Sequence, residues 1–272
     1  MEKDYSIDDI YENNPFVIML VFICGQIAIN RRNSKFTMDE KRLLSLYVLF
    51  SSLMNCIESI RVSSILARSY TQSYLEANEI DEEKYMTYYY DMVVHKISTI
   101  RDLEFKIVHM IYGLPKYKGK YCWRTIKRNK NKINNENLFN YFNDKTRFNY
   151  VSYLIRKRQQ SSHEGKLSLP QFKETTYYIG LRDLCKNPYY RKLHKDHFDY
   201  VNDPYITQKI SQSSTDTLQF LSNLHQSAMN MCYWFLGCLS LDLSNLVTTE
   251  MKQTYQDAIN RALKKIEKQN GI

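Results

Sequence analysis

The chain has 272 residues, 43% of them hydrophobic, and carries a net charge of +9. A chain of this length and apolar content can bury a sizeable core, as one large domain or as a helical domain with appended segments. Only 7 Gly and 5 Pro are present, too few for the turns of a many-stranded β protein. The composition therefore favours an all-α fold, and the charge indicates a polyanionic partner or a Lys-, Asn- and Tyr-rich proteome.

The first 36 residues are predicted to form an N-terminal segment with a short buried run. Residues 1–14 are acidic and are expected to be a poorly fixed lead-in. The apolar run Phe16–Ile29 is too short to span a membrane and is wrongly flanked for a signal peptide, so we expect a buried helix or strand. The six cysteines lack Cys-x-x-Cys spacing. They are expected to be reduced core residues of a cytoplasmic protein rather than zinc ligands or disulfides.

Two long helices are predicted next. The capping box Thr37-Met-Asp-Glu40 opens the first, which extends to about Asn78. The second starts near Asp81 and ends at Gly113-Leu-Pro115, a C-cap glycine followed by proline. Arg61 falls on the apolar stripe of the first helix. It therefore either reaches past the core to solvent or points into a polar site between helices.

A polar line is predicted on the second helix, away from its apolar stripe. His95, Asp102 and His109 are seven residues apart and share one face of the helix. Such a line is a solvated surface, a dimer seam or the wall of an active site.

The densest basic segment is Lys116–Lys132, which interleaves aromatic residues with its cations. It either pairs phosphates and stacks on bases of RNA or is a solvated connection between helices. The residues predicted to contact RNA are Lys127, Arg128, Lys130, Tyr121 and Trp123.

A third major helix is predicted to start at Asp144, a plausible N-cap before an apolar pattern that ends at Ile155. No apolar residue follows until Leu167. The polar end of this helix contains Arg158 and His163, a pairing of side chains that phosphate chemistry would use.

The run Arg158-Gln-Gln-Ser-Ser-His163, followed by Glu164-Gly165, resembles the Arg-x4-6-His motif of the HEPN superfamily. Many members of this all-α superfamily are metal-independent ribonucleases of toxin–antitoxin, abortive-infection and CRISPR-associated systems. The stretch His95–Leu114 also resembles the second long helix of the Cthe-type branch, in which an acidic residue recurs near the position of Asp102. By count alone Arg191-x5-His197 fits equally well, but it follows a turn-like Asn-Pro entry with no periodic run.

The resemblance implies that the RNA 2′-hydroxyl attacks the adjacent phosphorus. Arg158 would stabilise charge on the phosphoryl oxygens, and His163 would exchange a proton with the attacking or leaving oxygen. Residues five apart in an ideal helix are separated by about 140°, so both can face one target only if the helix frays near Ser161-Ser162. The resemblance also implies a homodimer that brings two such sites together.

Two departures from the family pattern concern the residues around the motif. Gln159 follows the arginine where Asn, Asp or His is usual. Gly165 stands where toxins silenced by a nucleotidyltransferase partner often have tyrosine, so that mode of regulation is not supported. Gln159 and Glu164 are secondary site candidates, together with Asp102 and Arg61.

The rest of the chain is also predicted to be helical, apart from an aromatic loop at Pro188–Pro204. Gly237, in the apolar run Cys232–Leu239, is expected to allow a close helix approach. An amphipathic helix from Thr249 to about Gln269 ends the chain. His194-Lys-Asp-His197 lacks a recognisable third metal ligand, and a surface loop is favoured there.

The sequence thus predicts an all-α bundle with long antiparallel helices and a C-terminal helical segment. Its parts are residues 1–36, a HEPN-like domain at 37–240 and a C-terminal helix at 241–272. The predicted function is a metal-independent endoribonuclease without a cofactor, acting as a toxin or antiphage effector with an antitoxin or defence-system partner. The alternatives are a catalytically silent RNA- or protein-binding module and a helical interaction subunit.

Overall fold

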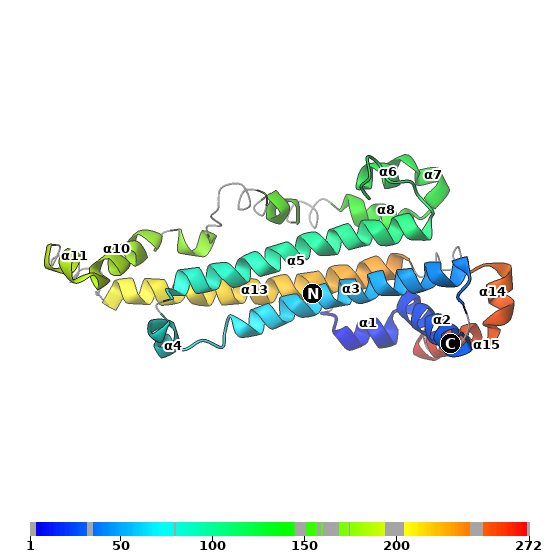
Figure 1. Cartoon of the computed structure of the whole chain (residues 1–272), viewed down its shortest axis with the longest axis horizontal. Coiled ribbons are helices and arrows are strands. Elements are labelled where there is room, and N and C mark those ends of the chain that lie inside the picture. The colour runs from blue at the N-terminus through cyan, green and yellow to red at the C-terminus, as the bar shows by residue number, and fades with distance from the viewer. Residues whose placement is uncertain are drawn as a thin grey trace. The chain divides into compact units, whose positions relative to one another are not determined.

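The computed structural model describes residues 4–31, 35–78, 80–144, 151–156, 159, 169–173, 175–193, 204–239 and 247–270. Within these ranges the regular structure is helical, apart from an isolated bridge between Tyr117 and Lys120, so the predicted all-α class is confirmed. The helices are α1 Ile7–Asn13, α2 Pro15–Asn30, α3 Met38–Leu66, α4 Gln72–Ala77, α5 Glu82–Ile111, α6 Trp123–Arg128, α7 Lys130–Ile133, α8 Glu136–Asn143, the 3-10 turn η1 Pro170–Phe172, α10 Thr176–Lys186, α11 Pro188–Leu193, α13 Pro204–Cys238, α14 Thr249–Thr254 and α15 Gln256–Asn270 (Figure 1).

The chain divides into two compact units. The first unit comprises Met1–Ile57, Ile97–Ser152 and Gln226–Ile272, and the second comprises Glu58–Lys96 and Tyr153–His225. Each of the long helices α3, α5 and α13 contributes one end to each unit. The first unit therefore takes chain from both sides of the boundaries predicted at residues 36 and 240.

Helices α3 and α5 are antiparallel, as predicted. In the first unit, Arg42 Nη2 near the start of α3 donates to Met110 O near the end of α5, at 2.6 Å. In the second unit, Tyr85 Oη near the start of α5 donates to Leu66 O at the end of α3, at 2.9 Å. The two hydrogen bonds join opposite ends of the two helices, which fixes their relative direction.

The first long helix is shorter than predicted. Its capping box forms, because Glu40 N donates to Thr37 Oγ1 at 3.2 Å and Thr37 N donates to Glu40 Oε2 at 2.7 Å. It ends at Leu66 instead of near Asn78, and α4 follows after a break. Thr71 Oγ1 accepts from Tyr74 N at 3.2 Å, a local bond that favours a new helix start over continuation of the old one.

The N-terminal segment is not the poorly fixed lead-in that its composition predicted. Ser6 and Asp9 form a capping box on α1. Asn14 then caps α2 by accepting from two backbone amides, so the apolar run after it is a buried helix. The Tyr5 ring stacks on Tyr233 of α13 at 3.7 Å between centroids. The acidic start is therefore anchored in the first unit.

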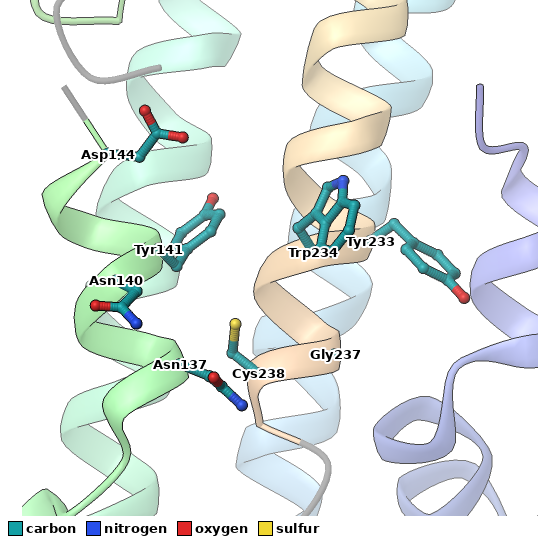
Figure 2. Close-up of a pocket in the computed structure, with 8 residues that line it drawn as sticks. All are labelled: Asn137, Asn140, Tyr141, Asp144, Tyr233, Trp234, Gly237 and Cys238. Carbon is teal, nitrogen blue, oxygen red and sulfur yellow. The ribbon is translucent and has the colours of Figure 1, made fainter. Parts of the chain in front are cut away.

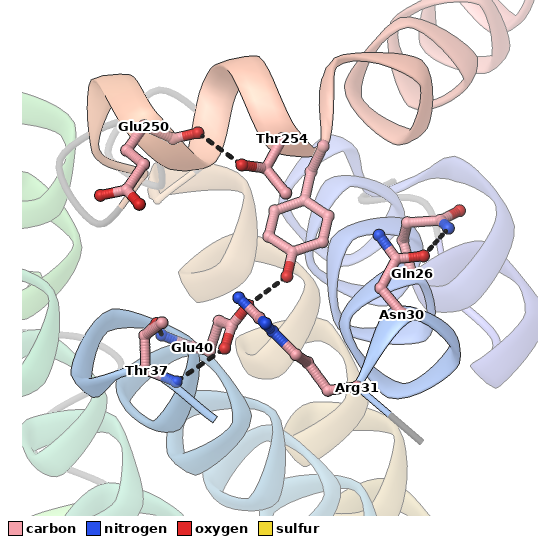
Figure 3. A network of polar contacts seen from close by, with 8 residues as sticks. Gln26, Asn30, Arg31, Thr37, Glu40, Glu250 and Thr254 are labelled. Atoms are coloured by element: carbon pink, nitrogen blue, oxygen red, sulfur yellow. Dashed lines mark hydrogen bonds and ion pairs between the residues drawn. The ribbon is translucent and has the colours of Figure 1, made fainter. Parts of the chain in front are cut away.

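The C-terminal helix covers α2 in the same unit (Figure 1). It is broken at Tyr255 into α14 and α15, whereas one helix was predicted. Figure 3 shows the polar network at this break. Glu40 accepts from Arg31 Nε at 3.0 Å and also from Tyr255 Oη. The broken helix thus lets one side chain tie the C-terminal segment to the start of α3.

Two further predictions need correction. The predicted loop after Pro188 begins instead with α11, because Asn187 Oδ1 accepts from Tyr189 N at 3.0 Å and caps a helix with proline at its first position. Residues 194–203 lie outside the described residues. At Gly237 an added Cβ would meet no atom within 4 Å, so no helix approaches closely there. By length and composition alone, α3 could cross a membrane, and so could α1 and α2 if the bent pair is counted as one span. Buried helices of soluble bundles share these properties.

Candidate functional site

The chain that leads into the Arg158–His163 motif is helical. Residues 151–156 form a helix, and Val151 and Leu154 are buried. Gln159 is helical and exposed. Arg158, His163 and Glu164 lie outside the described residues. Asp144, the predicted N-cap of this helix, is the C-cap of α8, with φ −62° and ψ 101°.

The basic segment that follows α5 folds back on itself as a tight turn. Lys118 and Gly119 have φ of +48° and +76°, and Tyr117 and Lys120 exchange backbone hydrogen bonds at 2.9 and 3.0 Å. Glycine adopts such a conformation readily, whereas lysine does so at some cost. The turn, together with α6, gathers cations around a single tyrosine.

These cations and that ring form what we call the Tyr117 cation cluster, made of Tyr117, Lys118, Arg124 and Arg128. The charged groups of Lys118, Arg124 and Arg128 lie 5.8, 5.0 and 5.9 Å, respectively, from the centroid of the Tyr117 ring. Arg124 Nη1 also donates to Tyr117 Oη at 3.3 Å. All three cations are exposed, and none of the ion pairs between described residues involves them. The cluster is therefore a concentrated positive patch, suited to an anion.

The predicted stacking residues of this segment serve as anchors. Trp123 is half-buried, with its ring 5.7 Å from Phe139 and 5.1 Å from Phe142. The Tyr121 ring packs edge-on against the His109 ring, with 5.2 Å between their centroids. Lys116 Nζ lies 4.7 Å from the centroid of the Tyr121 ring. The segment is thus packed on α5 and α8. Its exposed cations include the predicted Lys127, Arg128 and Lys130.

The predicted polar line on α5 is buried at its His109 end. Asp102 is exposed, but His109 is only 2% exposed because the returning chain covers the end of the helix. His109 Nε2 accepts from Cys122 N at 3.3 Å, and Nδ1 lies 3.4 Å from Leu114 O. His109 therefore holds the basic segment in place, whereas Asp102 remains at the surface of α5.

Arg61 lies at the surface of the second unit in a paired state. Its Nε and Nη2 donate to the two carboxylate oxygens of Glu58 at 2.7 and 2.6 Å. The hydrogen bonds from Arg61 lower the pKa of Glu58. Burial and the nearby positive charge of Arg61 lower the pKa of His225. Its Nε2 is buried without a hydrogen-bond partner among the described residues.

The sequence reasoning missed a buried carboxyl group in the first unit. Glu104 on α5 has no exposed surface, and its Oε1 accepts from Tyr141 Oη at 2.7 Å. Its Oε2 has no hydrogen-bond partner among the described residues. Burial raises the pKa of this carboxyl to about 7, and the hydrogen bond from Tyr141 and the charge of Arg101 oppose that rise. A signal existed, because position 104 falls between Ile100 and Ile107 on the predicted apolar stripe.

A pocket of about 520 Å³ lies beside Tyr141, between α8 and the last turns of α13 (Figure 2). Its volume is in the range typical of small-molecule sites. In Figure 2 the Tyr141 ring points from α8 toward α13, whereas the Tyr233 ring points away toward α1. The lining residues are Asn137, Asn140, Tyr141, Asp144, Tyr233, Trp234, Gly237 and Cys238.

Comparison of the chain with protein-family models, with curated proteins and with solved structures finds no match in any of the three. Within the described ranges, no three His, Cys, Asp or Glu side chains are grouped so that they could hold a metal ion.

Proposed function

We propose that the protein is a metal-independent endoribonuclease of the HEPN type. The observation that carries the proposal is the run Arg158-Gln-Gln-Ser-Ser-His163, which follows the helical residues 151–156 in the sequence of an all-α chain. The exposed Tyr117 cation cluster supports it, because a patch of this kind binds the phosphates of RNA. We further propose a cytoplasmic toxin or antiphage effector with an antitoxin or defence-system partner.

The proposed reaction is a transesterification. The 2′-oxygen of one nucleotide forms a bond to the adjacent phosphorus, the bond from phosphorus to the 5′-oxygen breaks, and a 2′,3′-cyclic phosphate remains. Arg158 would meet the charge on the phosphoryl oxygens with two parallel donors. His163 would accept the proton of the 2′-hydroxyl or supply one to the leaving 5′-oxygen, since its ordinary pKa lies near neutrality.

A homodimer would supply both proton transfers at once. One histidine cannot act as general base and as general acid in the same step. The two histidines of a two-fold dimer can each take one of these roles. We therefore propose that two Arg158–His163 motifs form one cleft around one RNA backbone. Light scattering that shows a stable monomer at working concentration would contradict this assembly.

The test is cleavage of a structured RNA by the purified protein and its variants. His163→Ala is expected to abolish cleavage while leaving RNA affinity nearly unchanged, and Arg158→Ala is expected to weaken both. The chain offers matched controls in Arg191→Ala and His197→Ala, because these residues repeat the motif by count and lie outside the proposed site. Equal loss of activity in all four variants would refute the assignment.

The second candidate function is a catalytically silent RNA-binding module. It is favoured by the exposure of the cations in the Tyr117 cation cluster, which would bind phosphate without any help from the motif. RNA binding without cleavage, unchanged by Arg158→Ala and His163→Ala, would identify this module. An absence of RNA affinity at low salt would point instead to a helical protein-interaction subunit.

A further inference from the structure

The pocket between α8 and α13 differs in charge from the rest of the protein. Among the described residues that line it, Asp144 alone has a formal charge, although the whole chain carries a net charge of +9. None of the described residues that line it is a lysine, arginine or histidine. These described lining residues offer no cation to a phosphate, and they suit a neutral or amino-bearing group.

The pocket combines aromatic surface with amide and carboxylate groups. Trp234 is 41% exposed at its wall, and Tyr141 contributes a ring whose hydroxyl proton is already donated to Glu104. Asn137 and Asn140 are exposed on α8. Each of these amides can both donate and accept. Planar heteroaromatic rings stack on tryptophan and tyrosine, and their edges are recognised by Asn and by carboxylates.

We propose that this pocket binds a nucleobase that carries an exocyclic amino group, as in adenine, cytosine or guanine. Asp144 and the Asn140 Oδ1 accept from the amino group, and the aromatic wall covers one face of the ring. Insofar as the base belongs to RNA, the inference rests on the proposed function: the Tyr117 cation cluster binds the backbone, and the pocket selects a base. A free nucleotide offers the same chemistry, and the experiment separates the two sources.

Gly237 provides a way to fill the pocket without disturbing the packing. An added Cβ at this position meets no atom within 4 Å, so a side chain there extends into open space. Gly237→Leu should occupy the pocket. Gly237→Ala is the matched control, because it makes the same change of backbone freedom and adds only one carbon. Both substitutions favour the helical conformation relative to glycine.

The test measures binding of equal-length A-only and U-only RNA oligomers to the full chain carrying His163→Ala, which prevents cleavage. Uracil lacks an exocyclic amino group. We expect the A oligomer to bind about tenfold more tightly, a usual factor for one specific base contact. Gly237→Leu should abolish this preference and Gly237→Ala should keep it. Equal affinity for both oligomers, together with no binding of free adenosine, overturns the proposal.

Titration with adenosine and with uridine, followed by tryptophan fluorescence, identifies the source of the base. Adenosine binding that Gly237→Leu abolishes, in a protein that does not discriminate between oligomers, assigns the pocket to a free nucleotide. If Gly237→Leu fails to fold, Asn140→Ala replaces it, and an unchanged preference in that variant contradicts the proposal. Cleavage that depends on His163, in a protein that neither discriminates between the oligomers nor binds adenosine, overturns the inference alone. Base binding without cleavage sinks the proposed function alone.

Discussion

The buried carboxyl group of Glu104 makes the stability of the protein depend on pH in a predictable direction. This side chain has no exposed surface. Tyr141 donates to one of its oxygens, while Arg101 and the buried thiol of Cys232 are also close enough to interact electrostatically. Replacing Glu104 by Gln keeps an acceptor for Tyr141 and removes the group that titrates. The substitution therefore isolates the cost of burying the charge.

The magnitude follows from the pKa of the carboxyl group, which burial raises from 4.5 to about 7. Below pH 4.5 the group is protonated in both the folded and the unfolded chain and has no effect. Between pH 4.5 and 7 the unfolded chain releases its proton while the folded chain keeps it, so the free energy of unfolding falls as pH rises. Above pH 7 the full cost is present, about 3 kcal/mol.

We therefore expect Glu104→Gln to raise the free energy of unfolding by about 3 kcal/mol at pH 8 and by less than about 1 kcal/mol at pH 5. Urea unfolding followed by circular dichroism at both pH values measures the difference from the unmodified chain. Glu267→Gln, at an exposed position, is the control and should show no pH-dependent difference. A Glu104→Gln effect that is the same at pH 5 and pH 8 would refute the reasoning.

Substitutions at three further places test the packing and the RNA surface. Tyr255→Phe removes a donor from the buried Glu40 carboxylate, and chemical denaturation should show a loss of about 2 kcal/mol. Asn14→Ala removes the cap of α2 and should cost about 1 kcal/mol, whereas Asn14→Ser should cost much less. Replacing Arg124 and Arg128 together by Gln should weaken RNA binding and flatten its salt dependence, by about 0.7 in slope for each phosphate contact removed. The matching Lys variants, which keep the charge, should retain the slope.

Local signals correctly predicted the start of α3 and the end of α5. The capping box at Thr37 and the terminator at Gly113 depend on hydrogen bonds within a few residues, so the sequence contains nearly everything that decides them. The anchoring of the N-terminal segment could not be predicted in this way. Tyr5 N donates to Asn230 Oδ1 at 3.1 Å across 225 positions of the chain, and no local pattern reports such a contact.

The candidate sites show the same division between local and distant signals. The period of the apolar residues predicts the buried stripe of α5, but it does not predict the polar Glu104 on that stripe, because a period describes the majority of positions. The pocket depends on which side of α8 faces the last turns of α13, and that is a tertiary fact. Arg158 and His163 can face one target only if the chain between them departs from ideal helix geometry, and residue spacing alone does not specify such a departure.

The proposed chemistry is tested most directly by the RNA itself. Two RNA strands of identical sequence are compared in the presence of EDTA, one of them with a 2′-deoxynucleotide immediately 5′ to the mapped cleavage position. We expect the unmodified strand to be cut there to a 2′,3′-cyclic phosphate, and the modified strand to remain intact at that position, because the attacking oxygen is missing. Cleavage of both strands, or activity that returns only with Mg²⁺ or Mn²⁺, would contradict the account.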